Sequence, residues 1–310
     1  MALISVRNLT KRYGGIVAVN NLSMTVEEGS VMGLIGPNGA GKTTTIKILL
    51  GLLRPDSGSV RVFGEDPWDN PEIKFRIGVI YEDAGFPPHH KVLDYLRRTC
   101  RIFGISESRA LEMLEAVDLQ KEAYRRPIRT LSAGMLQKFA IAHALIHKPE
   151  LVIADEPTSN LDPQARSKLL DLILQLHDEE KVSFLISSHI LPELSRVCSS
   201  VAIINNGRVW AQGSFMELCE KFGVGATRIS TDKPEILAEV LRRLDYVRNV
   251  RVNAGSVSVH ADPKRRQNLY EAVLKAAEKV NAKILGIESG TASLEELFRL
   301  AVDAGGGVND

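Results

Sequence analysis

The hydrophobic pattern over residues 1–220 alternates short apolar runs with longer stretches in which apolar residues recur every three or four positions. Short uninterrupted runs are typical of buried strands, and the periodic stretches are typical of helices. This alternation predicts an α/β region, with helices covering a mostly parallel sheet. The predicted strands are residues 31–35, 77–81, 151–155, 182–187 and 201–205, and the predicted helices are 42–51, 92–103, 106–118, 132–147 and 163–179.

The pattern changes near Phe222-Gly223, and the rest of the chain reads strand, helix, strand, strand, helix, strand, helix. The middle strands, 247–252 and 256–261, flank Asn253-Ala254-Gly255, whose residues tolerate the positive φ of a tight hairpin. This order predicts a small α+β domain of split βαβ, ferredoxin-like topology. We therefore expect two domains, residues 1–222 and 223–310.

Composition narrows the classes of function. The 310 residues include 39 Lys and Arg against 38 Asp and Glu, so the formal net charge is +1 and we predict no nucleic-acid partner. Cys100, Cys198 and Cys219 are an odd number and lie far apart, so they fit neither a disulfide framework nor a clustered zinc site. No signal-peptide core or long apolar run occurs, so we expect a cytoplasmic protein.

The segment from Gly36 to Thr43, Gly-Pro-Asn-Gly-Ala-Gly-Lys-Thr, joins a predicted strand to a predicted helix and satisfies the phosphate-loop pattern. Its glycines let backbone N–H groups surround an anion, and the helix turns its positive end toward the same anion. Lys42 then reaches the β- and γ-phosphates, and Thr43 offers its hydroxyl to Mg²⁺. The predicted ATP-binding residues of this segment are Gly36, Asn38, Gly39, Ala40, Gly41, Lys42, Thr43 and Thr44.

Two carboxylates, Asp155 and Glu156, end the apolar strand 151–155. Adjacent residues at a strand end point in different directions, so Asp155 can address a magnesium ion while Glu156 faces an attacking water. On its own such a pair is more often a solvated turn. Its position after the phosphate loop in the chain favours the catalytic interpretation.

The segment Leu131-Ser132-Ala133-Gly134-Met135 opens the predicted helix 132–147, with Ser132 as its N-cap. Together with the phosphate loop and the two carboxylates, it makes the chain resemble the ATP-binding subunits of ABC transporters. Their signature segment commonly reads Leu-Ser-Gly-Gly-Gln, from which this sequence departs at Ala133 and Met135. The resemblance covers about residues 1–222 and implies a P-loop ATPase domain with a mostly parallel sheet, an antiparallel β subdomain and a helical signature subdomain.

Four further positions take their meaning from this resemblance. Tyr13 stands where the family places a tyrosine that stacks on adenine, and His189 where it places a switch histidine near the γ-phosphate. The run Ser159-Asn160-Leu161-Asp162 resembles the loop that crosses the dimer interface. Glu82 occupies a strand end where the family usually has a glutamine that touches the metal and couples to the membrane partner. An ionised carboxylate there accepts hydrogen bonds but does not donate them.

The resemblance implies an ATPase that uses ATP and Mg²⁺ and powers separate transmembrane permease subunits from the inner face of the cell membrane. It implies a homodimer, or a dimer with a paralogue, in which Ser132 and Gly134 of one subunit face the nucleotide of the other. The implied catalytic residues are Glu156, His189 and Lys42, the implied metal ligands are Thr43, Asp155 and Glu82, and Asp162 and Glu82 serve dimerisation and coupling. The closing segment, residues 293–298, resembles the tail of drug- and antibiotic-exporting ATPases, which implies export.

Three other interpretations stay open. A soluble ABC ATPase acting on ribosomes or DNA usually carries two ATPase halves, a coiled-coil insertion or zinc fingers, and this sequence has none of them. A regulatory nucleotide-binding module with little turnover is favoured by Glu82, Ala133 and Met135. A phosphotransferase using the same loop leaves the signature and switch elements unexplained. The transported substrate is not encoded in any residue of this chain.

Overall fold

The computed structural model describes residues 2–82, 85–159, 161–222, 224–261, 265–290 and 293–306. The chain divides into two compact units, Met1–Gly213 and Ser214–Asp310. The second unit begins before helix α7 (Phe215–Phe222), because α7 packs against α10 (Leu294–Gly306) at the other end of that unit. The division therefore falls earlier than the boundary we expected after residue 222, and Gly223 itself lies outside the described residues.

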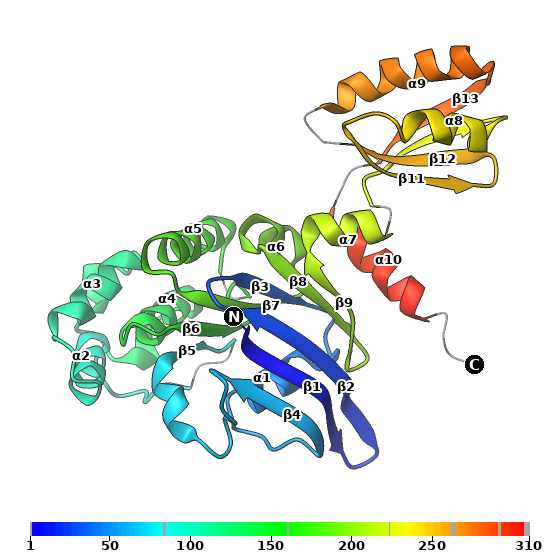
Figure 1. Cartoon of the computed structure of the whole chain (residues 1–310). Helices are drawn as coiled ribbons and strands as arrows, with labels where there is room; N and C mark the ends of the chain where they lie inside the picture. The colour runs from blue at the N-terminus through cyan, green and yellow to red at the C-terminus, as the bar shows by residue number, and fades with distance from the viewer. Residues whose placement is uncertain are drawn as a thin grey trace. The chain divides into compact units, whose positions relative to one another are not determined.

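A six-stranded sheet of order β5-β6-β7-β3-β8-β9 forms the centre of the first unit (Figure 1). Its strands are β3 (Val31–Ile35), β5 (Ile77–Ile80), β6 (Leu151–Asp155), β7 (Ser183–Ser188), β8 (Ser200–Asn205) and β9 (Arg208–Ser214). The first five of these are parallel to one another and confirm the five predicted strands to within one residue at each end. Every residue of β3 and β6 is buried, which explains why both are apolar up to Asp155, the last residue of β6.

A three-stranded antiparallel sheet of order β2-β1-β4 completes the β structure of this unit and is the antiparallel subdomain that the resemblance implied. Its strands are β1 (Ala2–Tyr13), β2 (Ile16–Glu27) and β4 (Ser57–Val62). Helix α1 (Lys42–Leu49) contacts β2, β4 and β6 and so links the two sheets. Ile4, Leu22, Ile46 and Ile153 are fully buried in the shared core, where each such side chain stabilises the fold by about 2 kcal/mol.

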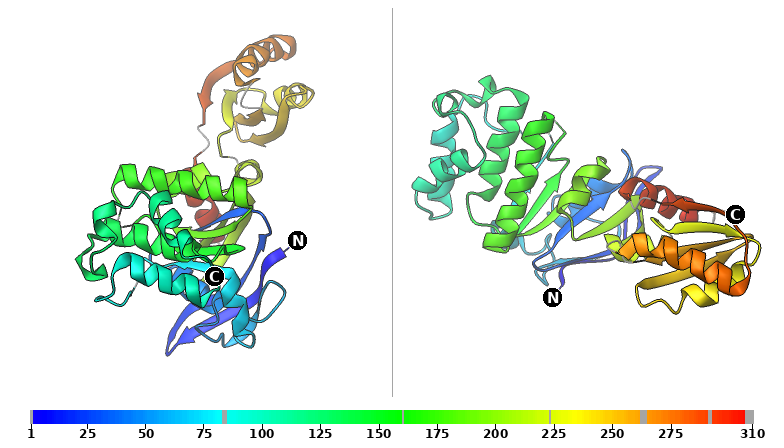
Figure 2. Two further views of the ribbon diagram at one scale, coloured as in Figure 1. Left: turned by 90° about the vertical axis from the view of Figure 1, so that its left-hand side faces the viewer. Right: turned by 90° about the horizontal axis from the view of Figure 1, so that it is seen from above.

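Helices surround the parallel sheet, and α2, α3 and α4 pack on one another beside β5 (Figure 2). The helices are α2 (Val92–Ile102), α3 (Ser108–Ala116), α4 (Ala133–Leu145), α5 (Pro163–Glu180) and α6 (Leu191–Val197), with short 3₁₀ turns at Pro71–Arg76, Lys121–Ala123 and Ile128–Thr130. All five predicted helices are present, and α4 begins after Ser132, whose hydroxyl accepts a hydrogen bond from Met135 N, as predicted for an N-cap. Helix α6 was not predicted because its two turns are too short to show a period.

The second unit contains a four-stranded antiparallel sheet of order β11-β12-β10-β13. Its elements are β10 (Thr227–Thr231), α8 (Pro234–Leu241), β11 (Val247–Asn253), β12 (Ser256–Ala261), α9 (Arg266–Val280) and β13 (Ile284–Ser289). Strand β12 separates β10 from β11, and β10 separates β12 from β13, so both βαβ units are split as predicted. Gly255 takes φ 71° in the predicted hairpin, and Ile229, Leu237, Val257 and Val273 fill the core.

The helices and the cysteines were also examined for membrane spans and disulfide bonds. Within the described ranges, no helix combines the length and the apolar character that a membrane span requires. Cys100, Cys198 and Cys219 are all free thiols. Burial raises the pKa of the Cys198 thiol to about 12, so this sulfur stays protonated at neutral pH.

Candidate active site

The phosphate loop connects β3 to α1 and is closely packed by its neighbours. A Cβ atom on Gly36 would come 2.3 Å from the Ile204 carbonyl oxygen, and one on Gly41 would come 2.5 Å from that of Ala18. Gly41 also has φ 103°, a conformation that glycine alone adopts without strain. The two glycines are therefore required by the path of the loop, independently of any ligand.

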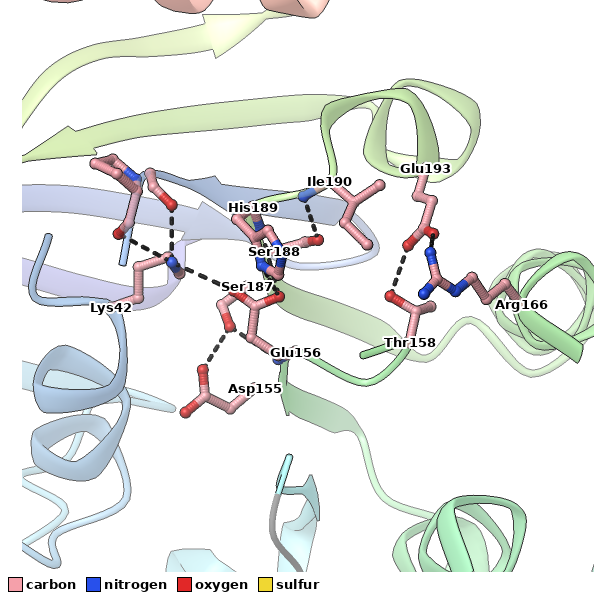
Figure 3. Close-up of polar contacts among 12 residues, drawn as sticks. Lys42, Asp155, Glu156, Thr158, Arg166, Ser187, Ser188, His189, Ile190 and Glu193 are labelled. Carbon is pink, nitrogen blue, oxygen red and sulfur yellow. Dashed lines mark hydrogen bonds and ion pairs between the residues drawn. The ribbon is translucent and has the colours of Figure 1, made fainter. Parts of the chain in front are cut away.

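Lys42 is the first residue of α1, and its side chain turns back into the loop (Figure 3). Its Nζ donates hydrogen bonds to the carbonyl oxygens of Gly36, at 2.8 Å, and Pro37, at 3.2 Å, and lies 3.3 Å from Glu156 Oε1. Lys42 is only 6% exposed, whereas Thr43 beside it is exposed. The loop thus surrounds a buried ammonium and presents a hydroxyl at its open side.

The two carboxylates lie at the end of β6, beside the parallel strand β7. Asp155 pairs with Ser187 across the strands, and Ser187 Oγ donates to Asp155 Oδ1 at 2.5 Å. The backbone N–H of Glu156 donates to both the carbonyl and the hydroxyl oxygen of Ser187. Asp155 and Glu156 are each 5% exposed, so neither is a residue of a solvated turn.

Glu156 has φ 49°, a left-handed conformation that is rare for a residue other than glycine. Strain of this kind persists only where surrounding contacts impose it, and it concentrates at functional sites. Here the double hydrogen bond from Glu156 N to Ser187 imposes it and aims the side chain away from that of Asp155. Glu156 Oε1 forms an ion pair with Lys42 but accepts no hydrogen bond from the described residues, so it keeps the capacity to accept one from a substrate.

His189 follows β7 and contacts the same carboxylate from the other side. Its Nδ1 lies 2.8 Å from Glu156 Oε2, and because an ionised carboxylate only accepts, Nδ1 carries the proton. The side chain is 47% exposed and so remains accessible to a ligand. Lys42, Glu156 and His189 therefore form a continuous row of contacts across three elements that are distant in sequence (Figure 3).

Glu82 lies at the same edge of the sheet as Asp155. Strands β5 and β6 are parallel, with Ile80 opposite Ala154, so the residues that follow both strands emerge side by side. Glu82 is exposed, and burial, with the nearby Asp155 charge, raises the pKa of Tyr81 just before it. Among the described residues, no three His, Cys, Asp or Glu side chains form a metal cluster.

Tyr13 ends β1, at the tip of the β1–β2 hairpin. Its ring is 48% exposed, and Lys11 Nζ lies 5.9 Å from the ring centre. The same hairpin approaches the phosphate loop, because the Ala18 carbonyl lies against Gly41. The hairpin thus carries an accessible aromatic ring on the strand pair that borders the loop.

The signature residues form a second group, apart from the first. Ser132 and Gly134, at the start of α4, line a hollow of about 280 Å³ together with Asp162. Asp162 caps α5 by accepting hydrogen bonds from Ala165 N and Gln164 N, which hold the pKa of its carboxyl below the usual range. No hydrogen bond or ion pair among the described residues joins this group to Lys42 or Glu156. Asn160, of the predicted interface loop, lies outside the described residues.

Three polar residues at the site were not predicted. Ser187 binds both carboxylate segments, Gln137 Nε2 donates to the Pro157 carbonyl at 2.8 Å, and Glu193 Oε2 accepts from Thr158 Oγ1 at 2.6 Å. Gln137 is 3% exposed, and a polar residue on the buried face of α4 was the signal that could have revealed it. Ser187 could have been found as the polar end of an apolar strand. Glu193 looks in sequence like an ordinary surface residue of a helix.

Comparison with known proteins assigns the class. The family model described as ABC transporter matches residues 19–159. The bacitracin transport ATP-binding protein of Bacillus licheniformis is 41% identical over 70% of this chain and 71% of its own length. The Nod factor export ATP-binding protein I of Cupriavidus metallidurans is 37% identical over 78% and 82%. The linearmycin resistance ATP-binding protein of Bacillus subtilis is 31% identical over 96% and 97%.

Solved structures that resemble this chain are also ATP-binding cassettes of ABC transporters. A dimeric bacterial ABC transporter cassette has a TM-score of 0.63 and 26% identity, covering 68% of this chain and 98% of that one. An ATP-binding subunit of an ABC transporter has a TM-score of 0.65 and 32% identity, covering 71% and 93%. The chain belongs to the family of ABC transporter ATP-binding proteins. It is an ATP-hydrolysing subunit that uses ATP with Mg²⁺.

Proposed function

We propose that this chain works as the ATPase of an exporter, attached at the cytoplasmic face of the cell membrane to a separately encoded permease. Two relatives with names that specify export and resistance, those for Nod factor and linearmycin, support the direction of transport. The linearmycin relative aligns over 96% of this chain, so the likeness extends into the second unit. The export-like segment 293–298 lies at the start of α10 in that unit.

The observation that carries the proposal is the row of contacts from Lys42 through Glu156 to His189. Lys42 binds the β- and γ-phosphates, with the backbone of Gly36 to Thr44 around them. The hydroxyl of Thr43 and the carboxylate of Asp155, with Glu82 at the same sheet edge, provide the oxygen ligands that Mg²⁺ prefers. Bound Mg²⁺ neutralises phosphate charge.

Hydrolysis then depends on Glu156 as a general base. Phosphate oxygens compete with Glu156 for its two present partners, Lys42 Nζ and His189, and this leaves the carboxylate to accept a proton. Water forms a bond to the γ-phosphorus as its proton passes to Glu156, and the bond from that phosphorus to the bridging oxygen breaks, with ADP as the leaving group. His189 donates to a phosphate oxygen through Nε2 when its ring is doubly protonated.

The second group of residues serves a partner subunit. Ser132 and Gly134 lie at the N-terminus of α4, where the helix dipole and unpaired N–H groups favour an anion. Because they make no contact with the Lys42 group of their own chain, we propose that they face nucleotide bound to a second copy or a paralogue. Asp162, in the same hollow, belongs to the dimer contact. Each chain thus supplies half of two composite sites.

Two more residues complete the proposal. Tyr13 offers its exposed ring to the adenine base, since flat aromatic faces stack on bases. Glu82 links the nucleotide site to the permease, because its strand end lies beside the Asp155 edge and its side chain is exposed. As a carboxylate it offers an acceptor to the permease and to metal-bound water.

Two measurements test this function. Mg²⁺-dependent phosphate release by the purified chain separates an ATPase from a regulatory module, and we expect turnover that EDTA abolishes. Affinity purification of the tagged chain from detergent-solubilised membranes should recover a membrane protein with several spans in comparable amount. Recovery with ribosomes or nucleic acid, and without a membrane protein, would contradict the exporter assignment and support the soluble alternative.

A further inference from the structure

Glu193 contacts two residues that follow the catalytic carboxylate in the chain, Thr158 and Arg166. Its Oε2 accepts a hydrogen bond from Thr158 Oγ1 at 2.6 Å, and its Oε1 accepts one from Arg166 Nη1 at 3.1 Å. Thr158 is 2% exposed and the Glu193 side chain is 13% exposed, whereas Arg166 is half-buried, so the network is buried at Thr158 and reaches the surface at Arg166 (Figure 3). Charge-assisted hydrogen bonds of this kind are roughly twice as strong as neutral ones.

The network connects the ends of three functional segments. Thr158 is two residues beyond Glu156, and Glu193 is four residues beyond His189 on the short helix α6. The bond from Thr158 to Glu193 therefore joins the same two chain segments as the contact between Glu156 and His189. The two chain segments are fastened to each other twice.

Arg166 brings in the third segment. It lies on α5, and besides Glu193 it binds the chain before that helix, since its Nε donates to the Leu161 carbonyl at 2.8 Å. Leu161 immediately precedes Asp162, the residue assigned to the dimer contact. The Glu193 carboxylate, on helix α6, thus links that helix to the loop after Glu156 and, through Arg166, to the loop before Asp162.

We propose that Glu193 is a positioning residue for hydrolysis. It fixes the positions of Glu156, His189 and the Leu161-Asp162 loop relative to one another. The inference rests on the roles proposed above for Glu156 and His189. Glu193 does not touch nucleotide; it acts through Thr158 and Arg166. Loss of this network displaces Glu156 from the attacking water without removing any phosphate ligand. The effect therefore falls on kcat and leaves KM for ATP nearly unchanged.

A second ion pair between α5 and α6 provides a control for the packing of these two helices. Arg196 on α6 also forms an ion pair with α5, through Asp171, and donates to Ser167 Oγ at 2.8 Å. This pair joins the same two helices but is exposed and touches none of the three functional segments. Exposed pairs contribute little to stability, so Asp171→Asn tests the helix contact alone.

The experiment measures ATP hydrolysis by the full chain for Thr158→Val, Thr158→Ser, Glu193→Gln and Asp171→Asn, with thermal unfolding of each. We expect Thr158→Val to lower kcat about tenfold, with KM within about twofold, because Val keeps the shape and removes the hydroxyl. Thr158→Ser keeps the hydroxyl and should retain most of the activity. Asp171→Asn should match the wild type.

A coupling test sharpens the result. Thr158→Val combined with Glu193→Gln should lose no more than the more impaired single variant, because both changes break one network. Wild-type kcat in Thr158→Val, losses that multiply in the double variant, or an equal loss in Asp171→Asn would overturn the inference. If Thr158→Val does not fold, Glu193→Gln decides by the same kcat and KM criteria.

These outcomes are distinct from failure of the proposed function. Absence of Mg²⁺-dependent turnover in the wild-type chain contradicts the ATPase function itself. Normal turnover in the wild type and in Thr158→Val contradicts only the positioning role of Glu193.

Discussion

Lys42, Asp155 and Glu156 are buried and tied together by contacts within one chain, whereas Ser132 and Gly134 lie at the accessible start of α4 and contact none of them. The first group is assembled by the parallel sheet before any ligand binds, because β3, β6 and β7 end at one edge. The second group has only a helix N-terminus to offer. We infer from this difference that the buried residues gather within one chain, whereas a second surface is needed to enclose the nucleotide.

Substitution of the base tests the buried group most directly. Glu156→Gln should lower kcat about a thousandfold, since an amide cannot accept the proton from water and general-base catalysis contributes about 10²–10⁴-fold. ATP binding should persist, because the phosphate ligands are intact. Phosphate release and size-exclusion chromatography with ATP check the two parts, with accumulation of a nucleotide-bound dimer expected. Wild-type turnover would refute the assignment.

Mixing two inactive variants tests the accessible group. Ser132→Arg should block the surface presented to a partner's nucleotide, and on its own it should be as inactive as Glu156→Gln. In a head-to-tail dimer, a mixture of the two restores one intact site per mixed dimer, or about a quarter of wild-type activity if subunits exchange freely and sites act independently. Phosphate release from the mixture measures this. If the mixture stays inactive while mixed dimers are detected, the composite site is wrong.

Removal of the buried ammonium separates binding from catalysis. Lys42→Ala should weaken ATP binding about a hundredfold, because charge-assisted hydrogen bonds to phosphate are lost and Glu156 loses a neutralising neighbour. Titration with a fluorescent ATP analogue measures the affinity. Lys47→Ala, on the exposed side of the same helix, is the control and should bind normally. Equal affinities in the two variants would contradict the role of Lys42.

A pH measurement separates the folding role of α4 from the role of its N-terminus. Burial and the neighbouring His147 lower the pKa of His143 to about 4, and the unfolded value is about 6.5. Between these values the unfolded state binds more protons, so stability is present above pH 6.5 and is lost as pH falls toward 4. This residue should cost about 2 kcal/mol between pH 7 and pH 5.

Chemical denaturation at the two pH values checks that expectation. His143→Phe should remove most of the loss, since the imidazole already lies among aromatic rings, with Phe86 at 5.3 Å and Tyr95 at 5.5 Å between ring centres. The same pH dependence in the variant and the wild type would show that another group is responsible. His143→Phe should leave ATP hydrolysis at pH 7 close to that of the wild type, because His143 is distant in the helix from Ser132.

The sequence predicted the parallel strands and their helices well, for a physical reason that single elements illustrate. Strand β6 is buried on both faces, so its first four residues are apolar and the run is easily recognised in the sequence. Strand β1 is half exposed, with bulges in its pairing to β2, and its sequence mixes polar and apolar residues. It was expected only through the family resemblance. The split βαβ order was predicted because its hairpin and helices each have a local signal.

Local sequence by itself determined the phosphate loop, the strand-end carboxylates and the cap of α4, because each depends on residues that are neighbours in the chain. Tertiary structure alone decided that Ser187 binds Asp155, that His189 and Lys42 share Glu156, and that Glu193 joins Thr158 to Arg166. These contacts depend on the register between parallel strands and on how α5 and α6 pack. Short-range propensities carry no information about either, since the partners are brought together by burial of a core that the whole domain shares.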